Sequence, residues 1–491
     1  MLFRSMARAN SGLASIAIRR PTRCKIPPTA IKKAAKIPTA METVLRVIDI
    51  FLTRPVGPET HINCMNVVQY VKRCIIKAAM NIPKDQKPYD AIVIGAGVAG
   101  AAIVKALKNN DIDNFLVLDQ ASGPGRGTSG HGFALCHPYI GRGASRLQRL
   151  TMLAFNEARQ IWQDYWSKSG VLHLPREPRG FDKTAMSERL LSQGFNLDKA
   201  RPLAAKESLD ITGVALAGTF FPDGGWVNLK KIAEDHLGKL KEKQKKWSCV
   251  VTSIQYKDEC WHVYGVNHEL IGVAQRLFLA NGLGARTVAA SAGIELPLKP
   301  VRGQLSTFNY GANSTWARAK PMVALSGKVY CLPPTQHDES GSYDWSVGST
   351  YDENEDDLAI WEKSHVENQT LIQEMFGDVY DASELRPIDA FVGIRCVAKD
   401  RLPVIGPIKG YPGLYVITAL GSRGVMWSAL ACQMYSEHLA EELRHSAFFD
   451  ERFFARARLA GEGLSDDLTS ALLPARFLAG ASNSKPIFPS A

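Results

Sequence analysis

The chain has 491 residues, of which 45% are hydrophobic, so it is long enough for two intertwined globular domains. Its formal net charge of +11 is uneven, because residues 1–40 hold nine Lys or Arg residues and no acid, which leaves +2 for the remainder. This near-neutral remainder argues against a generally basic nucleic-acid-binding protein, and no run approaches the roughly 20 apolar residues that span a membrane.

The first 87 residues precede the first clear folding pattern. Residues 1–40 are rich in Arg, Ser and Ala, which predicts a mitochondrial transit peptide, with a plastid leader or a disordered basic tail as the alternatives. Residues 41–87 are predicted to form a linker with a short amphipathic helix, because Val67-Val68, Val71 and Ile75-Ile76 recur at helical spacing.

The stretch from Tyr89 to Gln120 has the pattern of a complete βαβ unit. Two apolar runs of strand character enclose a small-residue helix, and the second run ends in Asp119. The turn before the helix has the spacing G-x-G-x-x-G, formed by Gly95, Gly97 and Gly100. Such a turn lets the backbone and the helix N-terminus approach a pyrophosphate, and the acid accepts hydrogen bonds from ribose hydroxyls. We therefore predict a dinucleotide site here.

Two later segments repeat the pattern of a strand that ends in a glycine turn. Apolar runs end at Asn281-Gly282 and at Gly421-Ser-Arg-Gly424, and a Gly/Ser-rich loop at 121–132 follows the βαβ unit. Backbone from several strands can then approach one cofactor closely. No metal ligand set is predicted. The predicted cofactor contacts are Gly95, Ala96, Gly97, Val98, Ala99, Gly100, Asp119, Gln120, Thr128, Ser129, Val250, Ala280, Asn281, Gly282, Gly421, Ser422, Arg423, Gly424 and Val425.

The glycine turns, together with the run from Gly393 to Gly406 (GIRCVAKDRLPVIG), resemble the D-amino-acid-oxidase-like FAD oxidoreductases. The resemblance implies an α/β fold, in which a Rossmann-like FAD-binding domain is interleaved with an antiparallel-sheet α+β substrate domain. It covers about residues 88–443. The expected FAD part is about 88–165, 226–296 and 386–443, the substrate part is about 166–225 and 297–385, and residues 444–491 are a C-terminal tail.

Within that family, shorter motifs resemble the flavin half of the bifunctional MnmC enzymes of tRNA wobble-uridine modification. These motifs are Phe221–Trp226, Val301–Gln304, Gly393–Cys396 and Leu420–Gly424. The resemblance implies oxidation of a secondary amine next to a carboxylate, converting carboxymethylaminomethyl-uridine of tRNA to aminomethyl-uridine. The alternatives are oxidation of a free amino acid such as glycine, sarcosine or a D-amino acid, and a non-enzymatic organelle flavoprotein. The 87 preceding residues are too few for the methyltransferase half of MnmC, so we expect the oxidation alone.

A substrate carboxylate requires a fixed cation, and a guanidinium binds a carboxylate through two hydrogen bonds. By the resemblance, Arg395 in the Gly-Ile-Arg run is the first candidate, and Arg423 and Arg302 are the second candidates. No His or carboxylate is predicted as a general base. Cys396 is expected to be a small buried residue without a covalent link to the flavin. The electron acceptor of the flavin stays open.

Overall fold

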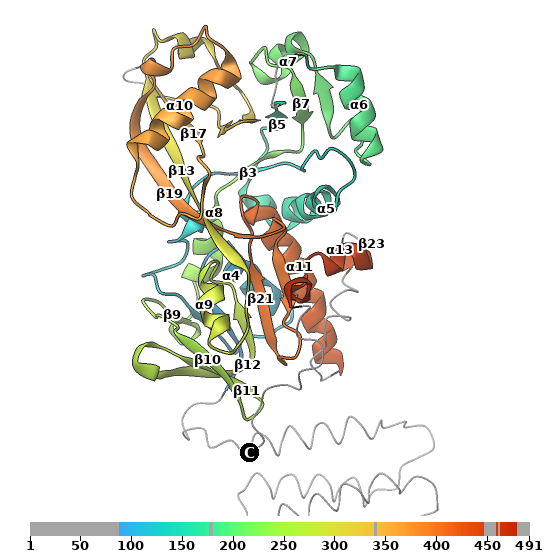
Figure 1. Ribbon diagram of the computed structural model, residues 1–491, viewed down its shortest axis with the longest axis vertical. Helices are drawn as coiled ribbons and strands as arrows, with labels where there is room; N and C mark the ends of the chain where they lie inside the picture. The colour runs from blue at the N-terminus through green and yellow to red at the C-terminus, as the bar shows by residue number, and fades with distance from the viewer. Residues whose placement is uncertain (1–87, 176–179, 338–340, 446–457, 460–461, 479–491) are drawn as a thin grey trace, which may run out of the picture. The chain divides into compact units, whose positions relative to one another are not determined.

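The computed structural model describes residues 88–175, 180–337, 341–445, 458–459 and 462–478, all within one compact unit of the chain, Ile82–Ala491. The predicted leader at 1–40 and the predicted linker helix at 41–87 lie outside the described residues. Two large sheets organise the described part, and Figure 1 labels their main strands and the helices that cover them.

The first sheet has eight described strands. Five of them are parallel, in the spatial order β21-β12-β1-β2-β9, and three antiparallel strands extend it. The parallel strands are β1 (Tyr89–Ile94), β2 (Phe115–Leu118), β9 (Lys245–Lys246), β12 (Leu270–Leu279) and β21 (Leu414–Thr418). The antiparallel strands are β10 (Ser253–Lys257), β11 (Cys260–Tyr264) and β20 (Val404–Pro407).

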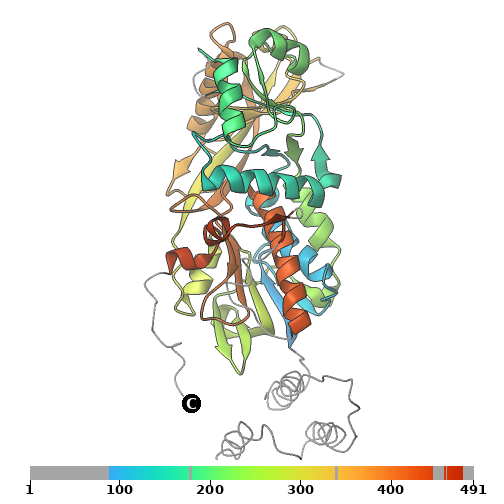
Figure 2. The same ribbon diagram turned by 90° about the vertical axis from the view of Figure 1, so that its right-hand side faces the viewer.

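Side chains of β1 alternate between two separate hydrophobic cores. Ala91 and Val93 pack in the core that contains α4 (Val98–Lys108), α5 (Arg146–Ile161) and α11 (Gly424–His445). Ile92 and Ile94 pack in the core that contains α9 (Gly284–Ala290) and the β10–β11 hairpin. A parallel sheet covered on both faces is expected to have such uninterrupted apolar strands. Figure 2 shows α5 in teal crossing α11 in orange, and the two helices are in contact.

The second sheet has ten described strands and is mainly antiparallel. Its two longest strands, β13 (Leu298–Tyr310) and β19 (Arg386–Ala398), pair antiparallel over almost their whole length. Helix α10 (Glu362–Phe376) contacts β13 and β17, and an aromatic core lies beneath it. The other strands are β5 (Val171–His173), β6 (Arg201–Leu203), β7 (Gly218–Phe221), β14 (Ala324–Ser326), β15 (Tyr330–Cys331), β16 (Thr335–Gln336), β17 (Tyr343–Gly348) and β18 (Asp352–Glu353).

The remaining described elements are short. A three-stranded sheet joins β3 (Ala134–Cys136), β8 (Gly225–Val227) and β4 (Trp166–Ser167), and β22 (Arg458–Leu459) pairs with β23 (Glu462–Gly463). The other α-helices are α6 (Lys183–Ser192), α7 (Ala205–Thr212), α8 (Leu229–Ala233) and α13 (Asp466–Ser470). None of the helices in the described ranges is long and apolar enough to cross a membrane. The predicted fold class, a Rossmann-like part interleaved with an antiparallel part, is confirmed.

One predicted domain boundary is wrong. Residues from 386 were assigned to the FAD part, but β19 belongs to the ten-stranded sheet. The reason is its long register with β13, in which Val301 pairs with Arg395 and Gly303 with Gly393. The chain returns to the eight-stranded sheet only at β20.

The prediction that residues 444–491 are a tail is wrong for the segment from Leu464 to Leu478. Leu464, Leu468, Leu472 and Leu473 are buried against the core that contains α5 and α11. The backbone carbonyl of Leu472 also accepts a hydrogen bond of 2.9 Å from the N–H of Ile405 in β20. Four buried leucines supply enough apolar contact to hold this segment on the domain.

Candidate cofactor and substrate site

The carboxyl ends of four parallel strands meet at one edge of the eight-stranded sheet. Beyond β1, β2, β12 and β21 lie Gly95, Asp119, Ala280 and the turn that ends at Gly421. Backbone hydrogen bonds continue past the strands, from Gly95 N–H to Leu118 O (2.7 Å) and from Ala280 N–H to Ile94 O (2.8 Å). We call these strand ends and the start of α4 the cofactor edge. Ligands of open α/β sheets bind at this kind of edge.

The three glycines of the first turn are each required by a close approach. Gly95 has φ +112°, and a Cβ there would overlap Ala280 O and lie 2.8 Å from Asn281 Cα. A Cβ on Gly100 would overlap the carbonyl of Gly95, and one on Gly97 would lie 2.9 Å from Ser129 Oγ. The strand, turn and helix can therefore pack this tightly only with glycine at all three positions.

Two helix N-termini lie together at the cofactor edge. Val98 N–H, at the start of α4, donates to Ser129 Oγ over 3.0 Å, and the next N–H groups, of Ala99 and Gly100, have no intrahelical acceptor. Helix α11 begins beside it, since a Cβ on Gly424 would lie 3.7 Å from Val98 Cγ1. The positive ends of two helix dipoles thus favour an anion such as a pyrophosphate.

Asp119 holds the turn and leaves acceptor capacity for a ligand. Its Oδ2 accepts from Ala96 N–H (2.6 Å) and its Oδ1 accepts from Ala121 N–H (2.8 Å), while each carboxylate oxygen has a second lone pair. The carbonyl of Asp119 accepts from Cys249 N–H (2.8 Å), which brings the 44% exposed Val250 to the same edge. Gln120, also predicted here, is exposed beside Asp119.

The other predicted cofactor contacts differ in how free their polar groups are. Asn281 Oδ1 is buried and has no partner among the described residues. Gly282 O accepts from Thr418 Oγ1 (2.8 Å), and Thr128 Oγ1 donates to Ile394 O (2.6 Å), so both groups are engaged. In the last turn Ser422 is exposed, Gly421 has φ +53°, and Val425 is buried.

These groups fit FAD. The two helix N-termini suit its pyrophosphate, Asp119 suits a ribose, and the unsatisfied oxygen of Asn281 requires a donor that a ligand can supply. The cofactor edge therefore joins, in space, predicted contacts from four separate parts of the sequence.

Arg395 lies on β19 and crosses the backbone of β13 at Gly303. A Cβ on Gly303 would lie 2.5 Å from Arg395 Cζ, so only glycine leaves room for the guanidinium. Its Nη1 donates to Thr350 O (3.1 Å) and Arg302 O (3.3 Å), and its Nη2 donates to Ser349 Oγ. Burial lowers the pKa of Arg395, and no described carboxylate pairs with it.

Arg423 precedes α11 and faces the ring of Tyr139, with 5.3 Å between Cζ and the ring centroid. Its guanidinium has no hydrogen bond or ion pair with any residue in the described ranges. Burial lowers its pKa, and the hydroxyl of Tyr351 interacts electrostatically with both Arg423 and Arg395. A largely buried cation without an anion is costly, so this site suits an anionic ligand.

The prediction that Arg302 binds substrate is contradicted by its surroundings. Its side chain is 0% exposed, and its guanidinium donates to Gln304 Oε1 (2.9 Å), Asp352 Oδ2 (3.2 Å) and two backbone carbonyls. It also stacks on Trp361, with Cζ 3.7 Å from the ring centroid. Arg302 therefore anchors the segment from 352 to 364, because its donors already have protein acceptors.

Three histidines near the arginines were missed by the sequence analysis. His137 and His173 both feel the charge of Arg423, and His131 feels that of Arg395. Burial lowers the pKa of His131 to about 4, that of His137 to about 3 and that of His173 to about 4, so all three are neutral at pH 7. We call Arg395, Arg423 and these residues the arginine–histidine cluster. Only His131, between Gly130 and Gly132 of the predicted loop, stood beside a motif.

Cys396 is buried and 7% exposed, as expected for a small core residue. Its Sγ lies 3.4 Å from Thr418 Oγ1, and burial raises the pKa of the thiol. A thiol of this kind is a poor nucleophile.

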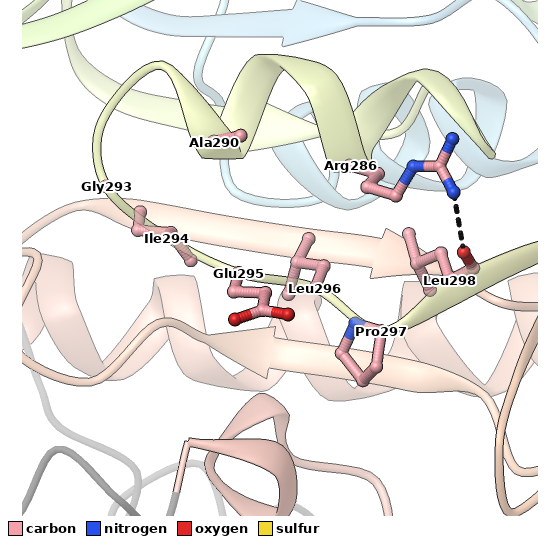
Figure 3. A pocket seen from close by; sticks show the side chains of 8 residues that line it. All are labelled: Arg286, Ala290, Gly293, Ile294, Glu295, Leu296, Pro297 and Leu298. Carbon is pink, nitrogen blue, oxygen red and sulfur yellow. Dashed lines mark hydrogen bonds between the residues drawn. The ribbon is translucent and has the colours of Figure 1, made fainter.

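A cavity of about 400 Å³ lies between α9 and the loop that follows it. Figure 3 shows Arg286 of α9 donating to Leu298 O across this cavity, with Glu295 on the loop. It contains none of the predicted site residues.

Comparison with known proteins gives consistent results. Residues 90–438 match the family model described as FAD dependent oxidoreductase. MnmC of Thiobacillus denitrificans, the "tRNA 5-methylaminomethyl-2-thiouridine biosynthesis bifunctional protein", is 30% identical over 70% of this chain and 55% of its own length. MnmC of Cupriavidus necator is 28% identical over 74% of this chain and 59% of its own length. The chain thus spans little more than half the length of these relatives.

Solved structures with the same fold are more distant in sequence. Glycine oxidase from Geobacillus kaustophilus has a TM-score of 0.55 at 19% identity, covering 78% of this chain and 99% of that chain. Iminodiacetate oxidase from Chelativorans sp. BNC1 has a TM-score of 0.56 at 17% identity, covering 74% and 98%. From the family match and the geometry of the cofactor edge, the chain belongs to the FAD-dependent oxidoreductases of the D-amino-acid-oxidase type, enzymes that use FAD and act on C–N bonds.

Proposed function

We propose that this enzyme oxidises the C–N bond of a secondary amine next to a carboxylate, converting carboxymethylaminomethyl-uridine of tRNA to aminomethyl-uridine. The observation that carries the proposal is Arg423, a largely buried guanidinium without an acceptor among the described residues, with Arg395 in the same cluster. The similarity to MnmC of Thiobacillus denitrificans, whose printed name is a tRNA modification activity, supports the tRNA substrate.

Arg395 and Arg423 have distinct tasks in this proposal. Arg395 already holds three protein acceptors and is fixed in direction, so its remaining donors bind one carboxylate oxygen. Arg423 has all its donors for the substrate and neutralises the carboxylate charge. Tyr351, which accepts a hydrogen bond of 2.7 Å from Arg401, lies beside Arg395 at the exposed side of the cluster.

The cluster also favours the reactive form of the amine. An amine must lose its proton before a hydride leaves the neighbouring carbon, and two guanidinium groups nearby disfavour an ammonium ion. The neutral histidines add no competing positive charge. When bound, FAD accepts the hydride. Water then hydrolyses the resulting C=N bond, which leaves aminomethyl-uridine on the tRNA and releases glyoxylate.

The product analysis is direct. Purified protein lacking residues 1–40 is incubated with tRNA that carries carboxymethylaminomethyl-uridine, and the nucleosides are analysed by mass spectrometry. The expected result is loss of the mass of one carboxymethyl group from that nucleoside, with an equal amount of glyoxylate. An unchanged nucleoside, with FAD bound to the protein, would contradict the tRNA substrate.

A free amino acid is the second candidate, and the charge distribution favours it. Outside residues 1–40 the net charge is +2, and lysines near α8 and β9 are paired with acids, as in Lys231–Asp235 (2.9 Å) and Lys245–Glu242 (2.9 Å). An RNA-binding face usually keeps its lysines unpaired for phosphates. Turnover of glycine, sarcosine or a D-amino acid without turnover of tRNA would establish this candidate.

We further propose that residues 1–40 direct the protein to mitochondria, with plastids as the alternative. The support is their composition, nine Lys or Arg residues without an acid. A fusion of residues 1–87 to a fluorescent protein should colocalise with a mitochondrial marker, whereas a diffuse signal would reject the proposal.

A further inference from the structure

Two histidines and one serine of the arginine–histidine cluster share a single hydroxyl group. Ser326 at the end of β14 pairs with His173 at the end of β5 in the parallel register of these strands. Ser326 Oγ lies 3.3 Å from His173 Nδ1 and 3.0 Å from His137 Nε2. His137 Nδ1 lies 2.9 Å from Pro138 O. These contacts form one chain of hydrogen bonds from Pro138 to His173.

The direction of every hydrogen bond in this chain follows from its ends. Pro138 O can only accept, so His137 Nδ1 carries a hydrogen, and neutral His137 then has an unprotonated Nε2. Ser326 must donate its single hydrogen to that nitrogen, and its oxygen therefore accepts from His173 Nδ1–H. Because His173 is also neutral, its Nε2 carries a lone pair. No described residue donates to this Nε2.

His131 has the opposite tautomer. Its Nδ1 accepts from Phe133 N–H over 3.2 Å, so neutral His131 carries its hydrogen on Nε2. His131 interacts electrostatically with Arg395, whereas His173 interacts with Arg423 and Arg189. Every free polar hydrogen in this part of the cluster belongs to an arginine or to His131, and the free nitrogen lone pair belongs to His173. A ligand with a carboxylate and an adjacent N–H would satisfy both kinds of group.

We propose that His173, held as the Nδ1–H tautomer by Ser326 and His137, accepts a hydrogen bond from the amine N–H of the substrate through its Nε2. This role rests on the proposed function, because it requires a substrate with an N–H next to a carboxylate. The hydrogen bond points the nitrogen lone pair of the amine away from His173 and fixes the orientation of the reacting carbon. His173 thereby selects amines over oxygen or sulfur analogues of the same shape.

The test uses two non-reactive carboxylates of nearly equal shape. Pyrrole-2-carboxylate offers an N–H at the position where 2-furoate has an oxygen lone pair. Dissociation constants are measured with the FAD-loaded protein from the change in flavin absorbance. We expect the wild-type protein to bind pyrrole-2-carboxylate about tenfold more tightly than 2-furoate, the ratio that one hydrogen bond supplies. In His173→Phe the ratio should fall to about one.

Ser326→Ala gives a second, independent test. The substitution removes the hydroxyl that fixes the tautomer and leaves His173 in place, so the preference for the N–H ligand should fall to an intermediate value. His236→Phe is the matched control, because His236 is packed against Trp162 and Tyr165, outside the cluster. Its ratio should equal that of the wild-type protein.

Equal binding of the two ligands to the wild-type protein, no binding of pyrrole-2-carboxylate, or an unchanged ratio in FAD-loaded His173→Phe would overturn the role of His173. These failures are distinct from failure of the proposed function. An enzyme that turns over its amine substrate but shows no preference for the N–H ligand rejects His173 alone. Absence of turnover with every secondary amine tested rejects the proposed function.

Discussion

The cofactor edge and the arginine–histidine cluster are built from different parts of the residues that form them. The cofactor edge uses backbone groups and absent side chains, as at Gly95, where the main chain of Ala280 occupies the space of a Cβ. The arginine–histidine cluster uses isolated side chains on unrelated elements, such as Arg395 on β19 and His173 on β5. Substitutions should therefore affect the two regions differently: the first should lose cofactor, and the second should keep it but lose substrate.

The largest effect is expected at the cofactor edge. In Gly95→Val the new side chain would overlap Ala280 O at a backbone φ of +112°, so the strand ends must separate. We expect a protein without FAD, measured as the ratio of flavin absorbance to protein absorbance. Gly123→Ala is the control, because nothing lies within 4 Å of a Cβ there, and it should retain FAD. Full FAD occupancy in Gly95→Val would show that the edge does not bind the cofactor.

The next largest effect is expected for Arg423→Ala. Loss of the carboxylate partner should lower kcat/KM by about 10²- to 10³-fold, while FAD content and thermal stability stay unchanged. The comparison variant is Arg302→Ala, in which the buried arginine leaves Asp352 and two carbonyls without a donor. It should lower the free energy of unfolding by about 3 kcal/mol. If Arg302→Ala were stable and inactive, and Arg423→Ala active, the two assignments would be reversed.

A smaller effect is expected for Gly303→Ala. The added methyl group displaces the guanidinium of Arg395 without removing it, since Cζ lies 2.5 Å from the position of that Cβ. We expect KM to rise about tenfold with little change in kcat, as for a weakened charged hydrogen bond. Steady-state kinetics with the amine substrate measure this. A KM equal to that of the wild-type enzyme would mean that Arg395 does not contact the substrate.

The smallest effect concerns acid stability. The pKa of His236 is lowered from 6.5 to about 4, first by burial, so the unfolded chain binds a proton that the folded chain does not between these pH values. The free energy of unfolding should therefore fall as the pH falls from 6.5 to 4, by up to about 1.4 kcal/mol per pH unit for each such histidine. Urea unfolding of His236→Phe should show a shallower fall, and an identical pH dependence would contradict the lowered pKa.

The two regions also differ in how far the sequence predicts them. The βαβ unit is predictable because Gly95, Gly97, Gly100 and Asp119 lie within 25 residues in a spacing that the backbone geometry requires. The later turns at Asn281 and Gly421 were predicted as strand ends, and parallel pairing of β12 and β21 brings them to the same edge. Their polar side chains, such as Thr128, bond to the protein in ways that spacing does not reveal.

The arginine–histidine cluster could be predicted only in part. Arg395 and Arg423 lie within motifs, but Arg302 has the same chemistry and is enclosed by a loop 50 to 60 residues later in the chain. His173 and Ser326 are 153 residues apart and meet only through the pairing of β5 with β14. Likewise, the buried leucines after Leu464 follow no pattern that distinguishes them from a tail. Contacts of this kind depend on tertiary pairing, which a single sequence does not specify.

The most direct measurement is the rate of flavin bleaching under anaerobic conditions when the FAD-loaded protein meets tRNA bearing carboxymethylaminomethyl-uridine. Glycine and sarcosine at saturating concentration are the parallel substrates, and Arg423→Ala is the matched variant. Rapid bleaching by the tRNA, absent in Arg423→Ala, is the result that our account predicts. Bleaching by glycine or sarcosine with none by the tRNA would contradict it and identify the enzyme as an oxidase of free amino acids.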